Sequence, residues 1–280
     1  MYDFIDSPDI ALDRTGATHK STALIDADSM IYIVGWQYKD SDDADKVGDS
    51  MNQFMSDIMI ITGSTQFAGF FSPKRTSRHD IYPAYKATRK PIDSGIAKWK
   101  PYIIEYMEEY WGFVTAINEE ADDAVADLQR GMSNTIICSP DKDLKQIPGR
   151  HYDYKKGIQS FVSGEQGKYN WAVQMITGDT TDNIKGVPGM GPVAARKLLG
   201  IGAGLVDEDE YEGIVQQVYL DKFGNLDEYL LHTKLIGMGD GNPDKYKHAL
   251  HTYDLANAKP SQYLREKLEL DQSIDVFAKR

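Results

Sequence analysis

Acidic residues occur in four short clusters, each at the end of an apolar run or at the start of a helix-compatible one. They are Asp26 with Asp28, then Glu120 with Asp122 and Asp123, then Asp141 with Asp143, and finally Asp179 with Asp182. Carboxylates gathered at one site raise one another's pKa values unless cations neutralise them. Hard divalent ions such as Mg²⁺ or Mn²⁺ prefer oxygen ligands, and no Cys/His set has zinc-ligand spacing. Two such ions about 4 Å apart can activate water and stabilise the leaving oxygen of a phosphodiester.

The cluster at residues 119–123 also has a purely structural explanation. Acids in the first turn of a helix interact favourably with the helix dipole. Residues three apart share a helical face, so Glu120 and Asp123 can point the same way with Asp122 beside them. The helix dipole explains this one cluster. It does not explain why acids recur after other elements, and that recurrence favours metal binding.

A basic stripe accompanies the acids, although the net charge of −12 argues at first against a polyanionic partner. Between residues 74 and 100 only Asp80 and Asp93 oppose a set of basic residues: Lys74, Arg75, Arg78, Lys86, Arg89, Lys90, Lys98 and Lys100. A solvated basic face is the ordinary explanation of such a run. Beside carboxylate clusters, the stripe suits phosphate, and we expect Arg78 and Lys90 to contact nucleic acid.

A glycine-rich turn precedes an amphipathic helix at residues 186–199, Gly-Val-Pro-Gly-Met-Gly-Pro-Val-Ala-Ala-Arg-Lys-Leu-Leu. Glycine permits close backbone approach, and N–H groups at a helix start can bind phosphate. A glycine-proline turn alone usually only connects two elements. This longer pattern indicates a helix-hairpin-helix motif over residues 183–199 that holds duplex backbone without reading sequence. Its expected DNA contacts are Gly186, Val187, Gly189, Gly191, Arg196 and Lys197.

Short apolar runs alternate with helix-length segments through the first part of the chain. Residues 22–25, 65–71, 113–117 and 135–139 are predicted strands, and residues 96–110 a predicted helix. The alternation predicts an α/β fold with a parallel sheet, whose ligands sit at the carboxyl ends of the strands. Glycine-joined helical segments follow, so we predict a catalytic domain at residues 1–170, containing a basic arch at 74–110, and a helical subdomain at 171–280.

Composition limits the class of protein. A chain of 280 residues with 41% hydrophobic residues can bury a sizeable core. No apolar run reaches membrane-spanning length and the N-terminus has no signal-peptide pattern, so we expect an intracellular protein, in the host cytoplasm if phage-encoded. The single Cys138 lies in an apolar run and is expected in the core.

The order and spacing of these motifs resemble the 5′-nuclease family of flap endonucleases and 5′-3′ exonucleases, including the 5′-nuclease domain of bacterial DNA polymerase I. The resemblance runs from about residue 24 to 199 and implies a PIN-like sheet. It is carried by Glu120-Ala121-Asp122-Asp123, by Asp141-Lys142-Asp143-Leu144 and by Gly178-Asp179-Thr180-Thr181-Asp182-Asn183 running into the glycine turn. It implies metal-dependent cutting of DNA with a free 5′ end, flap or branch, as in phage replication, with RNA primers in RNA–DNA hybrids as a further substrate.

The family pattern also implies roles for individual residues. Asp26, Glu120, Asp122 and Asp123 resemble ligands of the tighter metal, Asp141 and Asp143 resemble shared ligands, and Asp179 and Asp182 resemble ligands of a looser second ion. Tyr85-Lys86-Ala87-Thr88-Arg89 matches a gateway segment whose Lys86 and Arg89 stabilise charge at the scissile phosphate, while Tyr85 either stacks on a base or packs internally. Family members bind a monovalent cation in the hairpin, so K⁺ is expected there.

One departure from the family concerns the end of the second strand. The family usually carries another aspartate there, where this chain has Phe70-Phe71-Ser72. Asp28 is a candidate to compensate. The departure keeps open a branched-DNA binder without cleavage.

A second alternative is a haloacid-dehalogenase-like phosphatase, because Asp26-Ala27-Asp28 resembles its nucleophile motif. That interpretation leaves the central acids and the glycine turn unexplained.

Overall fold

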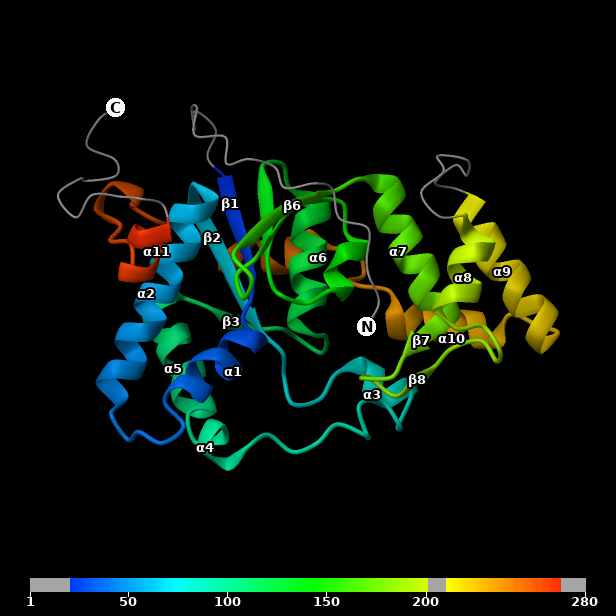
Figure 1. Ribbon diagram of the computed structural model, residues 1–280, viewed down its shortest axis with the longest axis horizontal. Coiled ribbons are helices and arrows are strands. Elements are labelled where there is room, and N and C mark those ends of the chain that lie inside the picture. The colour runs from blue at the N-terminus through cyan, green and yellow to red at the C-terminus, as the bar shows by residue number, and fades with distance from the viewer. Residues whose placement is uncertain (1–20, 201–209, 268–280) are drawn as a thin grey trace.

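The computed structural model describes residues 21–200 and 210–267, and its centre is one mainly parallel sheet (Figure 1). The strand order is β3-β2-β1-β4-β5-β6, in which β6 is antiparallel to β5, and β9 joins the outer side of β2 antiparallel. The predicted strands are confirmed, although the third is only two residues long. The strands are β1 (Ser21–Asp26), β2 (Ser64–Phe71), β3 (Val114–Thr115), β4 (Thr135–Cys138), β5 (Gly149–Asp153), β6 (Ile158–Val162) and β9 (His251–Thr252).

Helices cover both faces of the sheet, which explains why every residue of β1 is buried. Ala23 and Ile25 pack on one face against apolar side chains of α1 (Asp28–Gln37), α2 (Ala44–Thr62) and α5 (Lys100–Trp111). Leu24 packs on the other face against α6 (Ala121–Gly131) and the 3₁₀ helix η2 (Pro243–Ala249). The α/β class with a mainly parallel sheet is therefore confirmed.

Residues 74–100 form neither one long helix nor a single loop. They contain α3 (Ser77–Ile81), a turn, an extended stretch and α4 (Ser94–Ala97), and they run along the lower edge of the molecule in Figure 1. The turn contains Tyr85, whose buried ring belongs to the core of the helical layer on the right of that view. This basic segment therefore connects the sheet to the helical layer.

The helical layer has a core of its own. It consists of α7 (Gly164–Thr177), α8 (Pro192–Leu199), α9 (Glu210–Phe223) and α10 (Asp227–Ile236), with the short strands β7 (Gly178–Asp179) and β8 (Ile184–Lys185) between α7 and α8. The expected boundary after residue 170 falls inside α7. No helix among the described residues has the length and apolar character needed to span a membrane.

The chain then returns to the sheet through η2, β9, η3 (Leu255–Asn257) and α11 (Gln262–Lys267). The carbonyl oxygen of Lys259 accepts hydrogen bonds from Gln53 and Ser56 of α2, at 2.8 and 3.1 Å. Figure 1 shows α11, at the end of this segment, beside α2 and far from the helical layer. Residues 243–267 thus pack with the first half of the chain rather than with the helical segment in which they were placed by sequence. The parts of the predicted domains at residues 1–20, 201–209 and 268–280 lie outside the described residues.

Candidate active site

Asp26 ends β1 at the carboxyl edge of the sheet and is only 5% exposed. Its Oδ2 accepts a hydrogen bond from Ser139 Oγ at 2.8 Å, and its Oδ1 accepts one from the backbone N–H of Asp28 at 3.2 Å. Ser139 directly follows β4, the parallel neighbour of β1. Two adjacent strands therefore deliver polar groups to one place.

Asp141 and Asp143 lie in the turn after β4. Asp141 Oδ1 accepts the backbone N–H of Asp143 at 2.8 Å, while its own N–H donates to Ser139 Oγ at 3.0 Å. Asp143 Oδ1 lies 3.3 Å from Lys142 Nζ but has no partner with hydrogen-bond geometry among the described residues. The ion pair is thus loose, and this buried oxygen is incompletely satisfied.

The acids of this edge have raised pKa values. Burial, together with the charges of Asp28 and Asp141, raises the pKa of Asp26 to about 8. Burial, with the charge of Asp141, also raises the pKa of Asp143 to about 8. The pKa of Asp122 is raised too, chiefly by burial and then by Asp123 and Glu120. The acids therefore lie close enough to repel one another.

A divalent cation fits the donor chemistry of this edge. In the part of the chain that the structure describes, no Lys or Arg forms an ion pair with Asp26, Asp122 or Asp141. Within residues 21–200 and 210–267, no three acidic, His or Cys side chains converge as a preformed ligand set. Ion binding would therefore require these carboxylates to rotate toward one another, in exchange for relief of their repulsion.

Glu120 caps the N-terminus of α6 and faces the gateway segment. Its Oε2 accepts a hydrogen bond from Tyr85 Oη at 2.7 Å and lies 3.3 Å from Arg78 Nη1, while its Oε1 pairs with Lys86. Lys86 has a backbone φ of 57°, and its N–H donates to the carbonyl of Asp182 at 2.9 Å. The turn thereby aims the lysine into the acidic site.

Asp179 ends β7, which directly follows α7, and Asp182 lies in the turn after β7. Burial would raise the pKa of Asp179, but Lys142 and the N–H groups of Thr181 and Asp182 outweigh it, so the pKa is lowered. Asp182 Oδ1 accepts from Arg89 at 2.6 Å and its Oδ2 from Tyr85 Oη at 2.8 Å. Of the expected second acid pair, Asp182 is thus held against the gateway by its ion pair with Arg89, whereas Asp179 pairs with Lys142.

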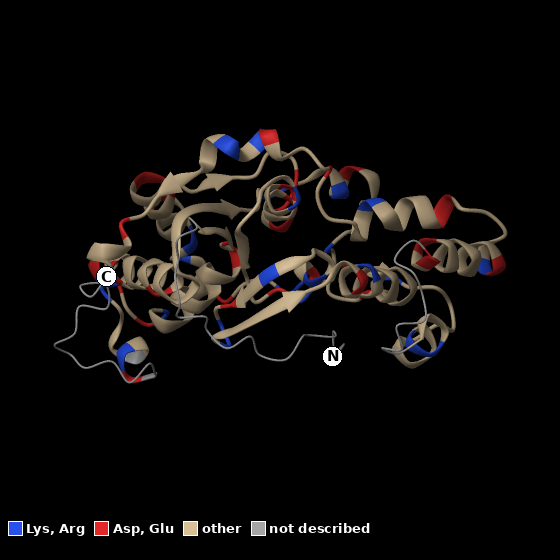
Figure 2. Cartoon of the chain, turned by 90° about the horizontal axis from the view of Figure 1, so that it is seen from above, with Lys and Arg blue, Asp and Glu red and all other residues tan. Residues whose placement is uncertain are grey.

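A small polar cavity lies among these groups. Its acidic lining consists of Glu120, Asp122, Asp143, Asp179 and Asp182, and α10 and the loop after it supply Leu235, Ile236 and Met238. The structure therefore brings residues from three of the four acidic clusters to one hollow, with the carboxylates of Asp26 and Asp141 beside it as charged neighbours of the others. In Figure 2, acidic and basic positions are interspersed over the fold.

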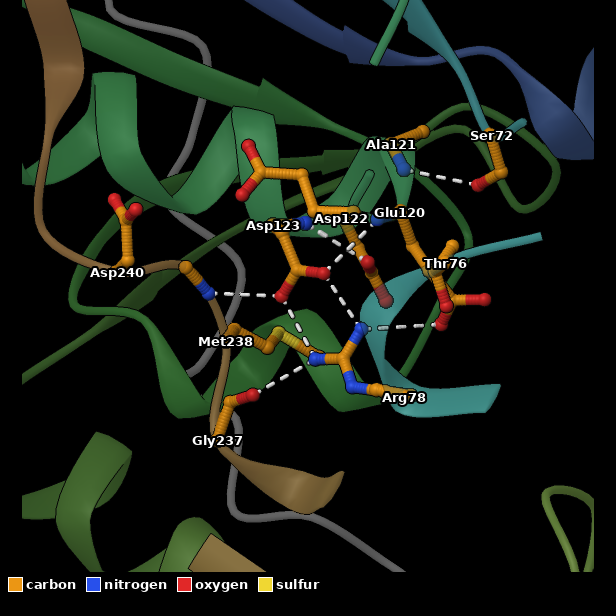
Figure 3. A network of polar contacts seen from close by, with 12 residues as sticks. Ser72, Thr76, Arg78, Glu120, Ala121, Asp122, Asp123, Gly237, Met238 and Asp240 are labelled. Carbon is orange, nitrogen blue, oxygen red and sulfur yellow. Dashed lines mark hydrogen bonds and ion pairs between the residues drawn. The ribbon is translucent and has the colours of Figure 1, made fainter. Parts of the chain in front are cut away.

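Two sequence-based expectations differ from the geometry, and the structure favours one of the two roles left open for Tyr85. Arg78, expected to contact DNA, is 6% exposed, because it is held in an ion pair with Asp123 (Figure 3). Asp123, expected to bind metal, is 4% exposed and accepts hydrogen bonds with both oxygens. Tyr85 is 3% exposed, so its ring packs internally and cannot stack on a base.

The glycine turn is partly built for packing. A Cβ on Gly186 would lie 2.2 Å from the backbone of Thr177, and the N–H of Val187 donates to the carbonyl of Ile176 at 2.8 Å. Gly189 has a φ of 79°, and a Cβ on it or on Gly191 would meet open space. Gly189 and Gly191 therefore remain open to a ligand, whereas Gly186 and Val187 anchor the turn to α7.

The other expected DNA contacts are more accessible. Lys90 and Lys197 are exposed and Arg196 is half-buried, while the side chain of Arg89 is 48% exposed. These side chains can meet a nucleic acid without unfolding of the segment that carries them.

Ser72 ends the segment Phe70-Phe71-Ser72, where the family pattern has an aspartate. Its N–H donates to Asp28 Oδ1 at 3.0 Å, and its Oγ accepts from the N–H of Ala121 at 2.9 Å. Asp28 therefore lies beside the departure, as expected of a compensating acid. The roles of Ser72 and Ser139 were not apparent from sequence, because a lone serine after a strand carries no distinguishing signal.

Replacing Asp26 with asparagine should change the pH dependence of stability in the presence of a chelator. Because the folded pKa, about 8, exceeds the ordinary value of 3.8, the folded state binds this proton more tightly. That contribution to stability is complete below the ordinary pKa and is lost as pH rises through about 8. Thermal unfolding between about pH 4 and 9 should show wild type losing stability relative to Asp26→Asn. Parallel curves would contradict the assignment.

Comparison with known proteins agrees with this arrangement. Residues 21–174 match the model of the 5′-3′ exonuclease N-terminal resolvase-like domain. DNA polymerase I of Caldicellulosiruptor bescii is 32% identical over 148 residues, covering 45% of this chain and 17% of that protein. Flap endonuclease Xni of Shewanella woodyi is 30% identical over 137 residues, covering 44% of this chain and 54% of that protein. The chain thus spans about half or less of the length of these relatives.

Solved structures support the fold. The bacteriophage T5 5′-exonuclease with bound zinc superposes with a TM-score of 0.56 at 16% identity, covering 90% of this chain and 99% of that one. A T5 flap endonuclease complex with DNA and metal ions gives a TM-score of 0.53 at 15% identity, with the same coverage. The family model covers more than half of the chain, and it leaves the phosphatase alternative without support. The chain therefore belongs to the family of the 5′-3′ exonuclease N-terminal resolvase-like domain.

Proposed function

We propose that this chain is a structure-specific 5′ nuclease, a flap endonuclease or 5′-3′ exonuclease, that hydrolyses DNA phosphodiesters at the carboxyl edge of its sheet. The observation that carries the proposal is the meeting of two groups there. Acids that form no ion pair with Lys or Arg among the described residues, led by Asp26, Asp122 and Asp141, lie beside a segment that inserts Lys86 and Arg89 among Glu120 and Asp182. Such a site can hold divalent ions and an anionic substrate together.

The residues suited to hold two Mg²⁺ or Mn²⁺ ions are those whose negative charge is least compensated. Asp26, Asp122, Asp141 and Asp143 form the inner group, with Asp28 in place of the absent aspartate, and Glu120, Asp179 and Asp182 complete the set when their cations turn toward substrate. Bound divalent ions supply Lewis-acid polarisation of the phosphodiester and ease deprotonation of the attacking water. The carboxylates orient these groups.

Lys86 and Arg89 are proposed to stabilise charge on the phosphate during cleavage. In the structure Lys86 pairs with Glu120 and Arg89 pairs with Asp182. A phosphate oxygen of the substrate could take the place of either carboxylate. Tyr85 is a positioning residue, because its hydroxyl bridges Glu120 and Asp182 from the buried side. The geometry thus separates the two cations that can reach substrate from the tyrosine that cannot.

The helix-hairpin-helix is proposed to hold the duplex arm of the substrate. α7 and α8 flank the turn, whose Gly189 and Gly191 are open, and Arg196 and Lys197 follow on α8. Carbonyl groups of the turn would be the ligands of K⁺. Contact there would be to phosphate and independent of sequence.

The substrate class is proposed as DNA with a free 5′ end, flap or branch, including RNA–DNA hybrids formed by primers. A role in phage replication and an intracellular location accompany that proposal. The segment Phe70-Phe71-Ser72, which lacks the family aspartate, favours one other candidate, a branched-DNA binder that does not cut.

Incubation with an end-labelled 5′-flap duplex tests the function directly. We expect cleavage near the branch or from the 5′ end with Mg²⁺ or Mn²⁺, and no cleavage with EDTA, on a sequencing gel. Binding without cleavage under every metal condition would identify the non-cutting binder instead. A parallel substrate with an RNA 5′ strand separates primer removal from a strict preference for DNA.

A further inference from the structure

The carboxylate of Asp123 is fully used by protein donors (Figure 3). Its Oδ2 accepts from Arg78 Nη1 at 2.5 Å and from the N–H of Glu120 at 3.0 Å. Its Oδ1 accepts from Arg78 Nη2 at 2.7 Å and from the N–H of Gly239 at 2.8 Å. A carboxylate offers about four acceptor positions. None of them remains for a metal ion.

Arg78 makes the complementary contacts. Besides its bidentate pair with Asp123, its Nη1 lies 3.3 Å from Glu120 Oε2 and its Nη2 donates to the carbonyl of Gly237 at 2.8 Å. Both charged side chains are less than a tenth exposed. A buried bidentate pair with further hydrogen bonds fixes geometry far more strongly than an exposed pair does.

The pair joins three segments that are distant in sequence. Arg78 is on α3, which precedes the gateway segment, and Asp123 is in the first turn of α6. Gly237 and Gly239 lie in the loop after α10. Gly239 has a φ of 68°, and a Cβ there would lie 2.0 Å from Asp127 Oδ1, so only glycine lets the loop approach α6 this closely. The loop closes over the side of α6 that carries Glu120 and Asp123.

We propose that Arg78 and Asp123 contact neither metal nor DNA but form a positioning pair, which holds Glu120 and the gateway lysine in register with the metal-binding acids. The inference rests on the proposed function for its catalytic consequence. It reassigns two residues whose types alone suggest a DNA contact and a metal ligand. It also makes the loop after α10 part of the structure that supports the site.

Metal binding and stability, measured without DNA, separate a ligand from a positioning residue. Asp122→Asn should weaken Mn²⁺ binding by about tenfold or more in calorimetric titration, because an uncompensated acid is lost. Asp123→Asn should change that affinity by less than about threefold but lower the melting temperature by about 5–10 °C. Equal loss of Mn²⁺ affinity in both variants would make Asp123 a ligand and overturn the proposal.

Arg78→Lys tests the other half of the pair with a change that keeps the charge but loses the bidentate fork. We expect a lower melting temperature and a lower kcat on flap DNA, with KM and the salt dependence of binding unchanged. A phosphate contact would instead weaken binding and reduce the salt slope by about one. The matched control is Arg75→Lys, whose exposed pair with Asp80 is also 2.7 Å long and should leave the melting temperature unchanged.

Loss of the nuclease function and loss of the positioning role would be distinguished by different results. If wild type does not cut DNA, the proposed function fails, while the titration and melting data still decide whether Asp123 is a ligand. If wild type cuts and Asp123→Asn keeps full kcat and full stability, the positioning role fails and the nuclease stands.

Discussion

Asp141→Asn should lower the cleavage rate of flap DNA by about a thousandfold or more, because loss of a central metal ligand removes several kcal/mol of transition-state stabilisation. Asp141 is a charged neighbour of Asp26, Asp122 and Asp143. Its replacement therefore disturbs every part of the metal set. Asparagine keeps an oxygen for the hydrogen bond from the N–H of Asp143, so the turn after β4 should retain its shape.

DNA binding by Asp141→Asn should be unchanged or tighter, since the variant removes negative charge and leaves the hairpin intact. Single-turnover cleavage and fluorescence anisotropy with the same labelled flap measure the two properties. The control is Asp221→Asn, an exposed acid of α9 that should leave both properties at wild-type values. Full cleavage by Asp141→Asn would remove the metal assignment.

Lys86→Met should lower kcat by about a hundredfold while changing KM by less than about threefold, because the charge acts mainly in the transition state. Methionine retains an apolar stem beside the Tyr85 ring, over which the lysine Nζ lies at 4.9 Å. The charge is removed from a point between Glu120 and Asp182, the latter 3.9 Å away. The loss is therefore electrostatic rather than a loss of packing.

Lys90→Met provides the contrast, since Lys90 is exposed and is proposed to contact DNA. It should raise KM more than it lowers kcat, and the rise in KM should shrink as salt increases, because one phosphate contact has been lost. Steady-state kinetics at several salt concentrations compare the two variants. A rise in KM without a fall in kcat for Lys86→Met would assign Lys86 to binding instead of transition-state stabilisation.

The sheet and its acidic edge were predictable because their signals are local. Buried parallel strands appear as continuous apolar runs, and such strands bring the residues after their carboxyl ends, here Asp26 and Asp141, to one edge. The Arg78–Asp123 pair was not predictable. Helical spacing correctly places Asp123 near Glu120, but its partners at residues 78 and 239 lie far away in sequence.

The returning C-terminal segment was missed for a different reason. η2, η3 and the two-residue β9 are too short to show a helical or strand period. Their positions are set by single contacts, such as Tyr246 against Phe70 with ring centroids 5.0 Å apart. The role of Tyr85 was also not decided by local sequence, because an aromatic residue beside basic residues can either stack on a base or pack in a core.

The pairing of β9 with β2 has a consequence for solubility. Gln66 and Phe67 pair with Thr252 and His251, and the carbonyl of Thr65 accepts the N–H of Tyr253 at 2.8 Å. A fragment cut after residue 174, where the family match ends, would expose this row of backbone donors and acceptors as an open sheet edge. Such an edge recruits strands from other molecules, so the family-matched region on its own would be prone to aggregation. Pairing with β9 thus protects the sheet from self-association.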